Sequence, residues 1–293
     1  MRQTLLLFCF IVLALVTAAL LSYPVYGILD TFSDIPFHKI ISRLSSLCGL
    51  LFIFLYLRFN NNLDAKTIGF NLADSHASSD IGRGFVSGVL IILVLETVLL
   101  LLDIHIPEPE LEFSPDFIAA MIIKALVAGI MVALLEELLY RGALLGGLAA
   151  KTGALNAIIT SSLIYAAVHF IRFPRIHADV DISWQTGLIS LSGAFHRFMD
   201  PAILDWFLTL FAFGVLLALV RLNKGNILQC MGIHAGGVMT LKISSELTDY
   251  NHATGLGFMV NTYNHQLGYL AFAWLCVILF VYYKYNLSTR KVD

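Results

Sequence analysis

The chain has 293 residues, of which 58% are hydrophobic and only 13% are charged, and its formal net charge is -2. Soluble domains carry roughly 25% charged residues, so this composition excludes an ordinary soluble domain and indicates a multi-pass integral membrane protein. No basic run is present, and a nucleic-acid partner is therefore not expected. The four cysteines fall in apolar stretches, which predicts buried thiols rather than disulfides or a zinc ribbon.

Eight apolar segments approach the length of a membrane-spanning helix. In chain order they cover residues 5–23, 40–57, 85–102, 117–150, 154–171, 203–220, 227–243 and 267–283. The apolar core of the first segment is longer than the roughly 7–15 residues of a secretory signal, so we expect a retained helix. We predict an all-α polytopic transmembrane helical bundle of about eight helices, which forms one membrane-embedded domain over residues 1–293.

Basic residues give the expected orientation. With the N-terminus inside, the cytoplasmic side holds eleven of them: Arg2, Arg58, Lys66, Arg83, Arg141, Lys151, Arg221, Lys224, Lys284, Arg290 and Lys291. The other side holds six: Lys39, Arg43, Arg172, Arg175, Arg197 and Lys242. The excess predicts that both termini are cytoplasmic.

Two polar connections, at residues 172–201 and 244–266, are longer than the others and lie on the predicted external side. They contain His177, His196, His252 and His265. The pattern of the first connection predicts an amphipathic helix at the membrane interface, with an ordinary loop as the alternative.

The fourth apolar segment carries the run EELLYR at residues 136–141. Each charge at bilayer depth costs about 2.5–3.5 kcal/mol on insertion scales, so a functional site is the expected reason for three of them. Glu137 and Arg141 are four residues apart, which predicts a salt bridge. Glu136 points about 100° away and shares its face with Tyr140, which leaves its carboxylate available for general acid–base chemistry. An ion-paired packing device is the alternative.

Two intramembrane histidines are further candidates. His169 follows Tyr165 by one helical turn. The chain is expected to reverse direction near residues 152–153, and His169 lies as far after this point as Glu136 lies before it. The two residues are therefore expected at similar depth. His234 precedes two glycines that permit close helix approach. A satisfied core histidine is the alternative for both. One Glu with two His is also a zinc-ligand set, but the HExxH helix pattern is absent.

Three other ionisable residues lie in or near the spans. We expect Glu96 and Lys124 to pair with each other across two helices and not to act in catalysis. The alternative for Glu96 is that it lines a substrate cavity. Asp205 is expected to stabilise the start of a helix.

The motifs share an order with a known family. EELLYR at residues 136–141 is followed by YAAVH at 165–169 and HAGGV at 234–238. They resemble the EExxxR, FxxxH and HxxxN (or HxxxD) motifs of the CAAX protease and bacteriocin-processing family, whose intramembrane proteases include the eukaryotic CAAX prenyl endopeptidase. Tyr165 replaces the phenylalanine, and Val238 stands where asparagine or aspartate is usual.

The resemblance implies a glutamate-dependent endopeptidase without a metal or other cofactor, with its catalytic core in the helices of residues 117–243. Glu136 and His169 would activate a water, Glu137 and Arg141 would brace the site, and His234 would stabilise the oxyanion.

Val238 offers no hydrogen bond to the oxyanion. Tyr165, Asn261 or Asn264 would then supply that donor, or the rate would fall by about 10²–10³.

We therefore predict an intramembrane endopeptidase that cleaves a membrane-associated protein or peptide within the lipid bilayer. The compact loops and the departures from the eukaryotic motifs favour a bacterial or archaeal plasma membrane. A catalytically inactive homologue acting as a membrane scaffold or immunity protein is the alternative, which Val238 favours. A transporter is disfavoured because the sequence has no inverted repeat.

Overall fold

The computed structural model describes residues 2–59, 68–72, 76–108, 114–176 and 181–289, so Lys66, His177, Arg290 and Lys291 lie outside the described residues. Most of these residues are helical and the two strands are short, which confirms the all-α prediction. Contacts divide the chain into two compact units, Met1–Asp64 with Ala167–Ile203, and Ala65–Ala166 with Leu204–Asp293. The single-domain organisation stays a prediction.

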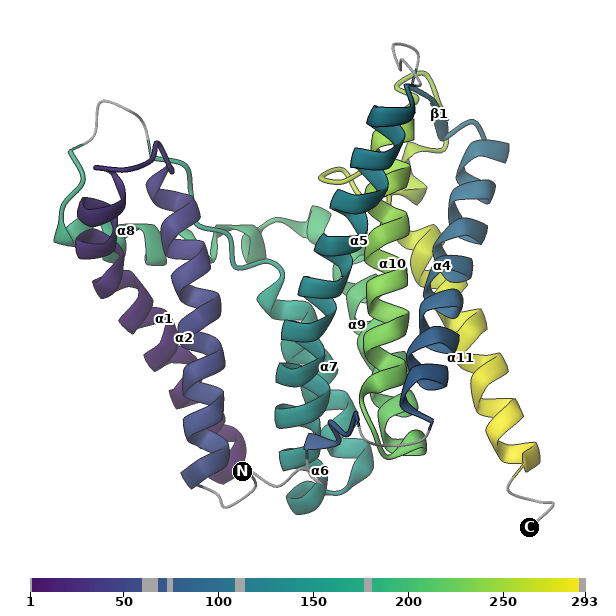
Figure 1. The fold of residues 1–293 in the computed structure, drawn as a ribbon, viewed down its shortest axis with the longest axis horizontal. Coiled ribbons are helices and arrows are strands. Elements are labelled where there is room, and N and C mark those ends of the chain that lie inside the picture. The colour runs from purple at the N-terminus through teal and green to yellow at the C-terminus, as the bar shows by residue number, and fades with distance from the viewer. Residues whose placement is uncertain (1, 60–67, 73–75, 109–113, 177–180, 290–293) are drawn as a thin grey trace. The chain divides into compact units, whose positions relative to one another are not determined.

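The first unit is built on two consecutive helices, α1 (Arg2–Leu29) and α2 (Phe37–Phe59), which pack along each other (Figure 1). A third helix, α8 (Trp184–Gly193), packs against α1. The short 3₁₀ turns η2 (His196–Met199) and η3 (Pro201–Ile203) follow it.

Helix α8 lies in the connection where an amphipathic helix was expected. Ser183 and Thr186 form a capping box at its start. Thr186, Gly187 and Ser190 are buried, and Gly187 lies so close to the carbonyl of Ala19 that a Cβ would clash with it. The opposite face exposes Trp184, Leu188 and Ile189. This apolar outer face matches the lipid-facing side of an interfacial helix.

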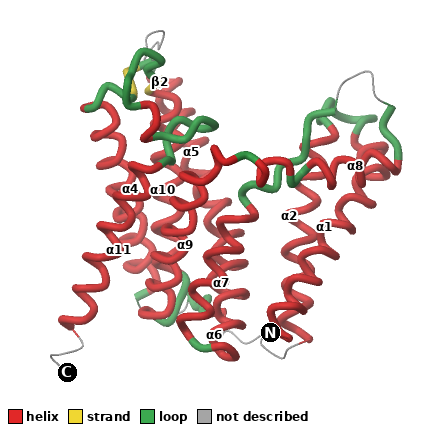
Figure 2. The backbone as a smooth tube through the Cα atoms, turned by 180° about the vertical axis from the view of Figure 1, so that it is seen from behind, coloured by secondary structure: helices red, strands yellow, loops and turns green. Residues whose placement is uncertain are grey.

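The second unit holds the charged run. Its elements are α4 (Ala77–Leu101), β1 (His105–Pro107), α5 (Pro115–Glu137), η1 (Leu138–Leu145), α6 (Gly146–Thr152), α7 (Ala154–Val168), α9 (Leu204–Lys224), α10 (Leu228–Leu247), β2 (Thr248–Tyr250), η4 (Gly257–Met259) and α11 (Tyr269–Thr289). The strands β1 and β2 pair antiparallel with His105 opposite Tyr250, beside the end of α10 (Figure 2).

Elements α5, η1 and α6 form one helical stretch of 38 residues, Pro115–Thr152. Ser114 caps its start by accepting a hydrogen bond from the N–H of Phe117. Gly153 ends it with φ of +83°, a conformation that favours glycine, so the turn lies where it was expected. Among the described helices, five are long and apolar enough to cross a membrane, and the segments Ala154–Val168 in α7 and Tyr269–Tyr285 in α11 are shorter apolar helical stretches. The total of about eight spans stays a prediction.

Helix α10 lies between α4 and α5 and packs against both (Figure 1). Its contact with α4 depends on two pairs of glycines spaced four residues apart: Gly84 and Gly88 on α4, and Gly232 and Gly236 on α10. A Cβ at any of these positions would clash with backbone atoms of the facing helix. Small residues at this spacing let two helix backbones approach closely.

Replacement of Gly88 tests this contact. The added methyl of Gly88→Ala would meet the carbonyl of Ile233, so we expect a loss of about 1–3 kcal/mol of stability from overpacking. Gly82→Ala is the matched control, because no heavy atom lies within 4 Å of a Cβ there. Alanine should be neutral or stabilising at that position. Thermal unfolding in detergent measures both variants, and equal melting temperatures would contradict the close packing.

Candidate active site

The carboxylate of Glu137 is the centre of a buried polar cluster. Its Oε1 lies 2.7 Å from Nδ1 of His234 on α10 and 3.3 Å from Nη1 of Arg141. Glu137 is 0% exposed, Arg141 2% and His234 4%. The predicted salt bridge between Glu137 and Arg141 is therefore present, and His234 shares its acceptor oxygen.

This hydrogen bond fixes the proton on the His234 ring. An ionised carboxylate only accepts hydrogen bonds, so Nδ1 donates to Glu137. The other nitrogen, Nε2, is directed toward Glu136 and lies 3.7 Å from its Oε2. That separation exceeds a direct hydrogen bond.

The two adjacent glutamates have different environments. The side chain of Glu137 is completely buried, whereas 27% of the Glu136 side chain is exposed. The helix therefore gives the two glutamates different surroundings, although Oε2 of Glu136, the oxygen nearest His234, is itself buried.

The helix changes its geometry directly after these glutamates. Residues Leu138–Leu145 form a π-helix between the α-helices α5 and α6. Such segments are rare and occur frequently at functional sites. Six residues of η1, including Tyr140 and Arg141, are buried. Nothing in the sequence indicated this segment.

Aromatic rings enclose the cluster. The guanidinium carbon of Arg141 lies 4.4 Å from the ring centroid of Tyr165, which is a cation–π distance. Phe213 on α9 contacts the His234 ring edge-on, with centroids 5.5 Å apart. Tyr140 packs edge-on against Tyr165 at 5.1 Å. Phe213 was not a sequence candidate, because it is one apolar residue in an apolar helix.

The two other motif residues, His169 and Val238, lie directly after α7 and on α10. His169 follows the last residue of α7, is half-buried and belongs to the first unit. Its cooperation with Glu136 stays a prediction. Val238 lies on α10 one turn after His234 and is half-buried.

Asn261, one of the residues expected to supply the missing oxyanion donor, forms other hydrogen bonds. Nδ2 of Asn261 donates to Oδ1 of Asp205 at 2.6 Å, and its Oδ1 accepts from the N–H of Tyr263. Asp205 also accepts from the N–H of Trp206 in the first turn of α9, which supports its structural role. Asn264 accepts hydrogen bonds from the N–H groups of Gln266 and Leu267 through Oδ1.

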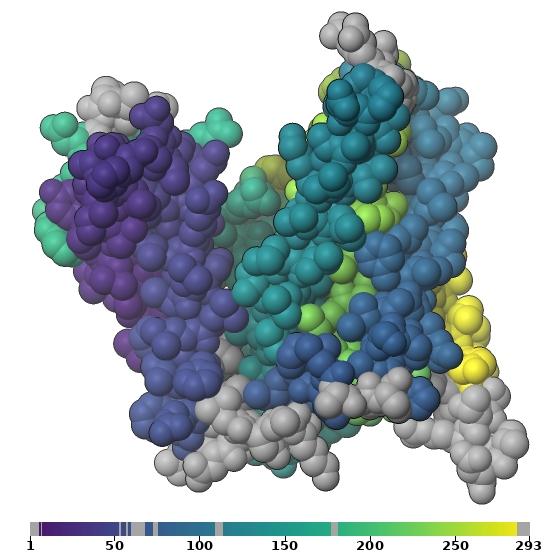
Figure 3. All heavy atoms as spheres, viewed as in Figure 1, coloured from purple at the N-terminus to yellow at the C-terminus, as the bar shows by residue number. Residues whose placement is uncertain are grey.

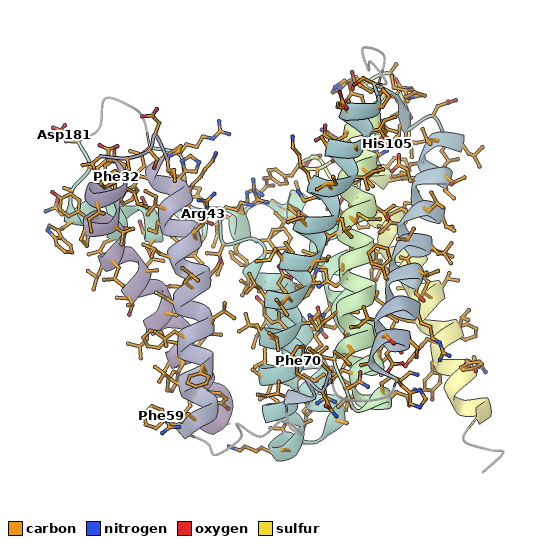
Figure 4. The ribbon with its side chains drawn as sticks, in the orientation of Figure 1. Phe32, Arg43, Phe59, Phe70, His105 and Asp181 are labelled. Atoms are coloured by element: carbon orange, nitrogen blue, oxygen red, sulfur yellow. The ribbon has the colours of Figure 1, made fainter. Side chains whose placement is uncertain are left out.

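Glu96 does not pair with Lys124, so that expectation is wrong. Its Oε1 lies 2.7 Å from Nδ1 of His105, whose Nε2 bonds the carbonyl oxygen of His265 at 2.7 Å. Thr248 donates a further hydrogen bond to Glu96. His105 follows a short turn after α4, at the start of β1 (Figure 4), so a local partner satisfies Glu96. This cluster fixes the β1–β2 pair to α4.

Within the described ranges, no three His, Cys, Asp or Glu side chains are gathered as metal ligands. The site residues that the structure brings together are Glu136, Glu137, Arg141, Tyr165 and His234.

The region that carries the three motifs is similar to a known family. Residues 118–239 match the family model described as type II CAAX prenyl endopeptidase Rce1-like. The resemblance is confirmed. The matched region begins in α5, includes all three motifs and ends one residue after Val238. No curated protein and no solved structure matches the chain.

The Glu96–His105 pair predicts pH-dependent stability. Burial lowers the pKa of His105, but the hydrogen bonds to Glu96 and the His265 carbonyl, with the charges of Glu96 and Asp249, raise it above its ordinary value overall. The stabilisation from protonated His105 is complete below about pH 6.5, the usual pKa of histidine, and is lost as the pH rises through the raised pKa.

Melting temperatures of the wild type and His105→Gln, measured from pH 5.5 to 8.5, test this linkage. We expect their difference to be largest at pH 5.5 and to shrink as the pH rises. His196→Gln, at an exposed position, is the control. A difference that is constant with pH would contradict the linkage.

Proposed function

We propose that this protein is an intramembrane endopeptidase that hydrolyses a peptide bond in a membrane-associated protein or peptide. Its match to a CAAX endopeptidase family and its apolar helices support an integral membrane protease. The observation that carries the proposal is the orientation of His234. Nδ1 of His234 is hydrogen-bonded to Glu137, and Nε2 is directed at Glu136, whose side chain is 27% exposed.

In the proposed mechanism Glu136 acts as the general base. It takes a proton from a water while the water oxygen attacks the peptide carbonyl, and it then returns the proton to the leaving amine. By the family resemblance, His169 shares the activation of this water. The chemistry proceeds in an apolar helix bundle, where fixed dipoles and charges act more strongly than in water.

His234 would stabilise the oxyanion that forms on the carbonyl. When Nε2 is protonated, it donates to that oxygen while the Glu137 carboxylate compensates the positive imidazolium. Arg141 forms a salt bridge with Glu137, and the ring of Tyr165 packs on the guanidinium. Glu137 and Arg141 are therefore positioning residues that act through His234. The same logic governs the carboxylate that orients the histidine in serine proteases.

The second candidate function is a catalytically inactive homologue that acts as a membrane scaffold or immunity protein. Val238 favours this alternative, because valine supplies no oxyanion donor. The intact geometry at Glu136 and His234 favours the protease.

Loss of cleavage on replacement of Glu136 tests the proposal. Cells that express the wild type, Glu136→Gln or Asp116→Asn at matched levels are compared by mass spectrometry of membrane-protein termini. We expect a processed terminus that disappears with Glu136→Gln, because the amide cannot accept the proton, and that persists with Asp116→Asn, whose side chain is exposed in the first turn of α5. Identical termini in all three strains would favour the scaffold.

Val238→Asn tests the missing donor. An amide one turn after His234 would add a hydrogen bond to the oxyanion, so we expect cleavage of the identified substrate to accelerate by up to about 10²-fold. Val238→Leu adds no donor and should give no gain. If the asparagine variant folds normally and is no faster than the leucine variant, this position does not serve the oxyanion.

A further inference from the structure

A pocket lies between the first half of α5 and the last turns of α10, away from the Glu137–His234 pair. Its volume is about 290 Å³, near the lower end of the range for small-ligand pockets. It is lined by Phe117, Ala120, Met121, Lys124 and Ala125 of α5 and by Lys242, Ser245 and Glu246 of α10. Figure 3 shows α10 (green) reaching the surface in the seam between α5 (teal) and α4 (blue).

The charged groups of this pocket come from both helices. Lys124 lies on α5, and Lys242 and Glu246 are one turn apart on α10. In the described part of the chain, no ion pair involves either lysine. Two lysines and one glutamate leave a net positive charge next to an apolar wall. This combination suits a ligand with a phosphate, an amine and a hydrocarbon portion.

The length of the helix places the pocket at the membrane surface. The stretch Pro115–Thr152 has 38 residues and is about 57 Å long, more than the roughly 40–45 Å of a bilayer with its headgroups. Lys124 and Lys151 are 151 − 124 = 27 residues apart on it, or about 40 Å. When Lys151 is at one headgroup layer, Lys124 is at the other.

We propose that this pocket binds the headgroup of an amine-bearing glycerophospholipid of the phosphatidylethanolamine type. Lys124 and Lys242 bind the phosphodiester and Glu246 binds the ammonium group, while Ala125, on the bilayer side of Lys124, contacts the glycerol. A free phosphate would meet the apolar wall and the repulsive Glu246 carboxylate. A headgroup without an amine would leave that carboxylate unpaired.

Native mass spectrometry of the full-length protein in detergent tests the assignment. Phosphatidylethanolamine, phosphatidylglycerol, phosphatidylcholine or inorganic phosphate is added separately, and the bound fraction gives each Kd. We expect phosphatidylethanolamine to bind most tightly and Lys124→Gln with Lys242→Gln to weaken it at least tenfold. Lys39→Gln, at an exposed lysine of the first unit, should leave it unchanged.

Glu246→Gln separates headgroup recognition from simple charge attraction. The amide should remove the preference for phosphatidylethanolamine over phosphatidylglycerol while both lipids still bind. The proposal is overturned if the double lysine variant, with an unchanged melting temperature, retains phosphatidylethanolamine. It is also overturned if the wild type binds both lipids equally, or if inorganic phosphate displaces the lipid. Because lipid binding is measured without a substrate, the outcome is independent of the proposed protease activity.

Discussion

The second unit depends on one buried carboxylate that an arginine and a histidine share. Glu137 is completely buried, and removal of one partner from a buried ion pair typically costs about 3–5 kcal/mol. Oε1 of Glu137 forms an ion pair with Arg141 on its own helix and lies 2.7 Å from Nδ1 of His234 on α10. The interaction therefore fixes the helix that carries Glu136 relative to the helix that carries the imidazole. It also determines which nitrogen of that imidazole faces Glu136.

Close helix packing makes this interaction possible. His234 lies midway between Gly232 and Gly236, the two glycines by which α10 approaches α4. Gly129 of α5 similarly lies close to the carbonyl of Ala235. Because α10 packs closely against α4 and α5, the His234 side chain reaches the Glu137 carboxylate directly, without a bridging water. These glycines have no reactive side chain, but the close packing that they permit determines the geometry of the site.

Local features of the site could be predicted from the sequence, and features that depend on packing could not. The Glu137–Arg141 bridge follows from a spacing of four residues, and the helix end at Gly153 from a local glycine signal. The π-helix changes hydrogen-bond register without a distinctive residue pattern. Pairing of Glu96 with Lys124 was expected because both are ionisable and lie in or near the predicted spans, whereas the partner His105 follows a short turn and is brought back by strand pairing.

The two Glu–His pairs show why one is proposed for catalysis and the other is not. In each, a buried glutamate lies 2.7 Å from a histidine Nδ1. They differ at the second ring nitrogen. Nε2 of His105 is consumed by the backbone carbonyl of His265, so this imidazole has no nitrogen left for a reacting group. Nε2 of His234 faces instead Glu136 at 3.7 Å, which is beyond a direct hydrogen bond. A buried histidine can hold a structure through both nitrogens, but it can move a proton only when one nitrogen faces the substrate side.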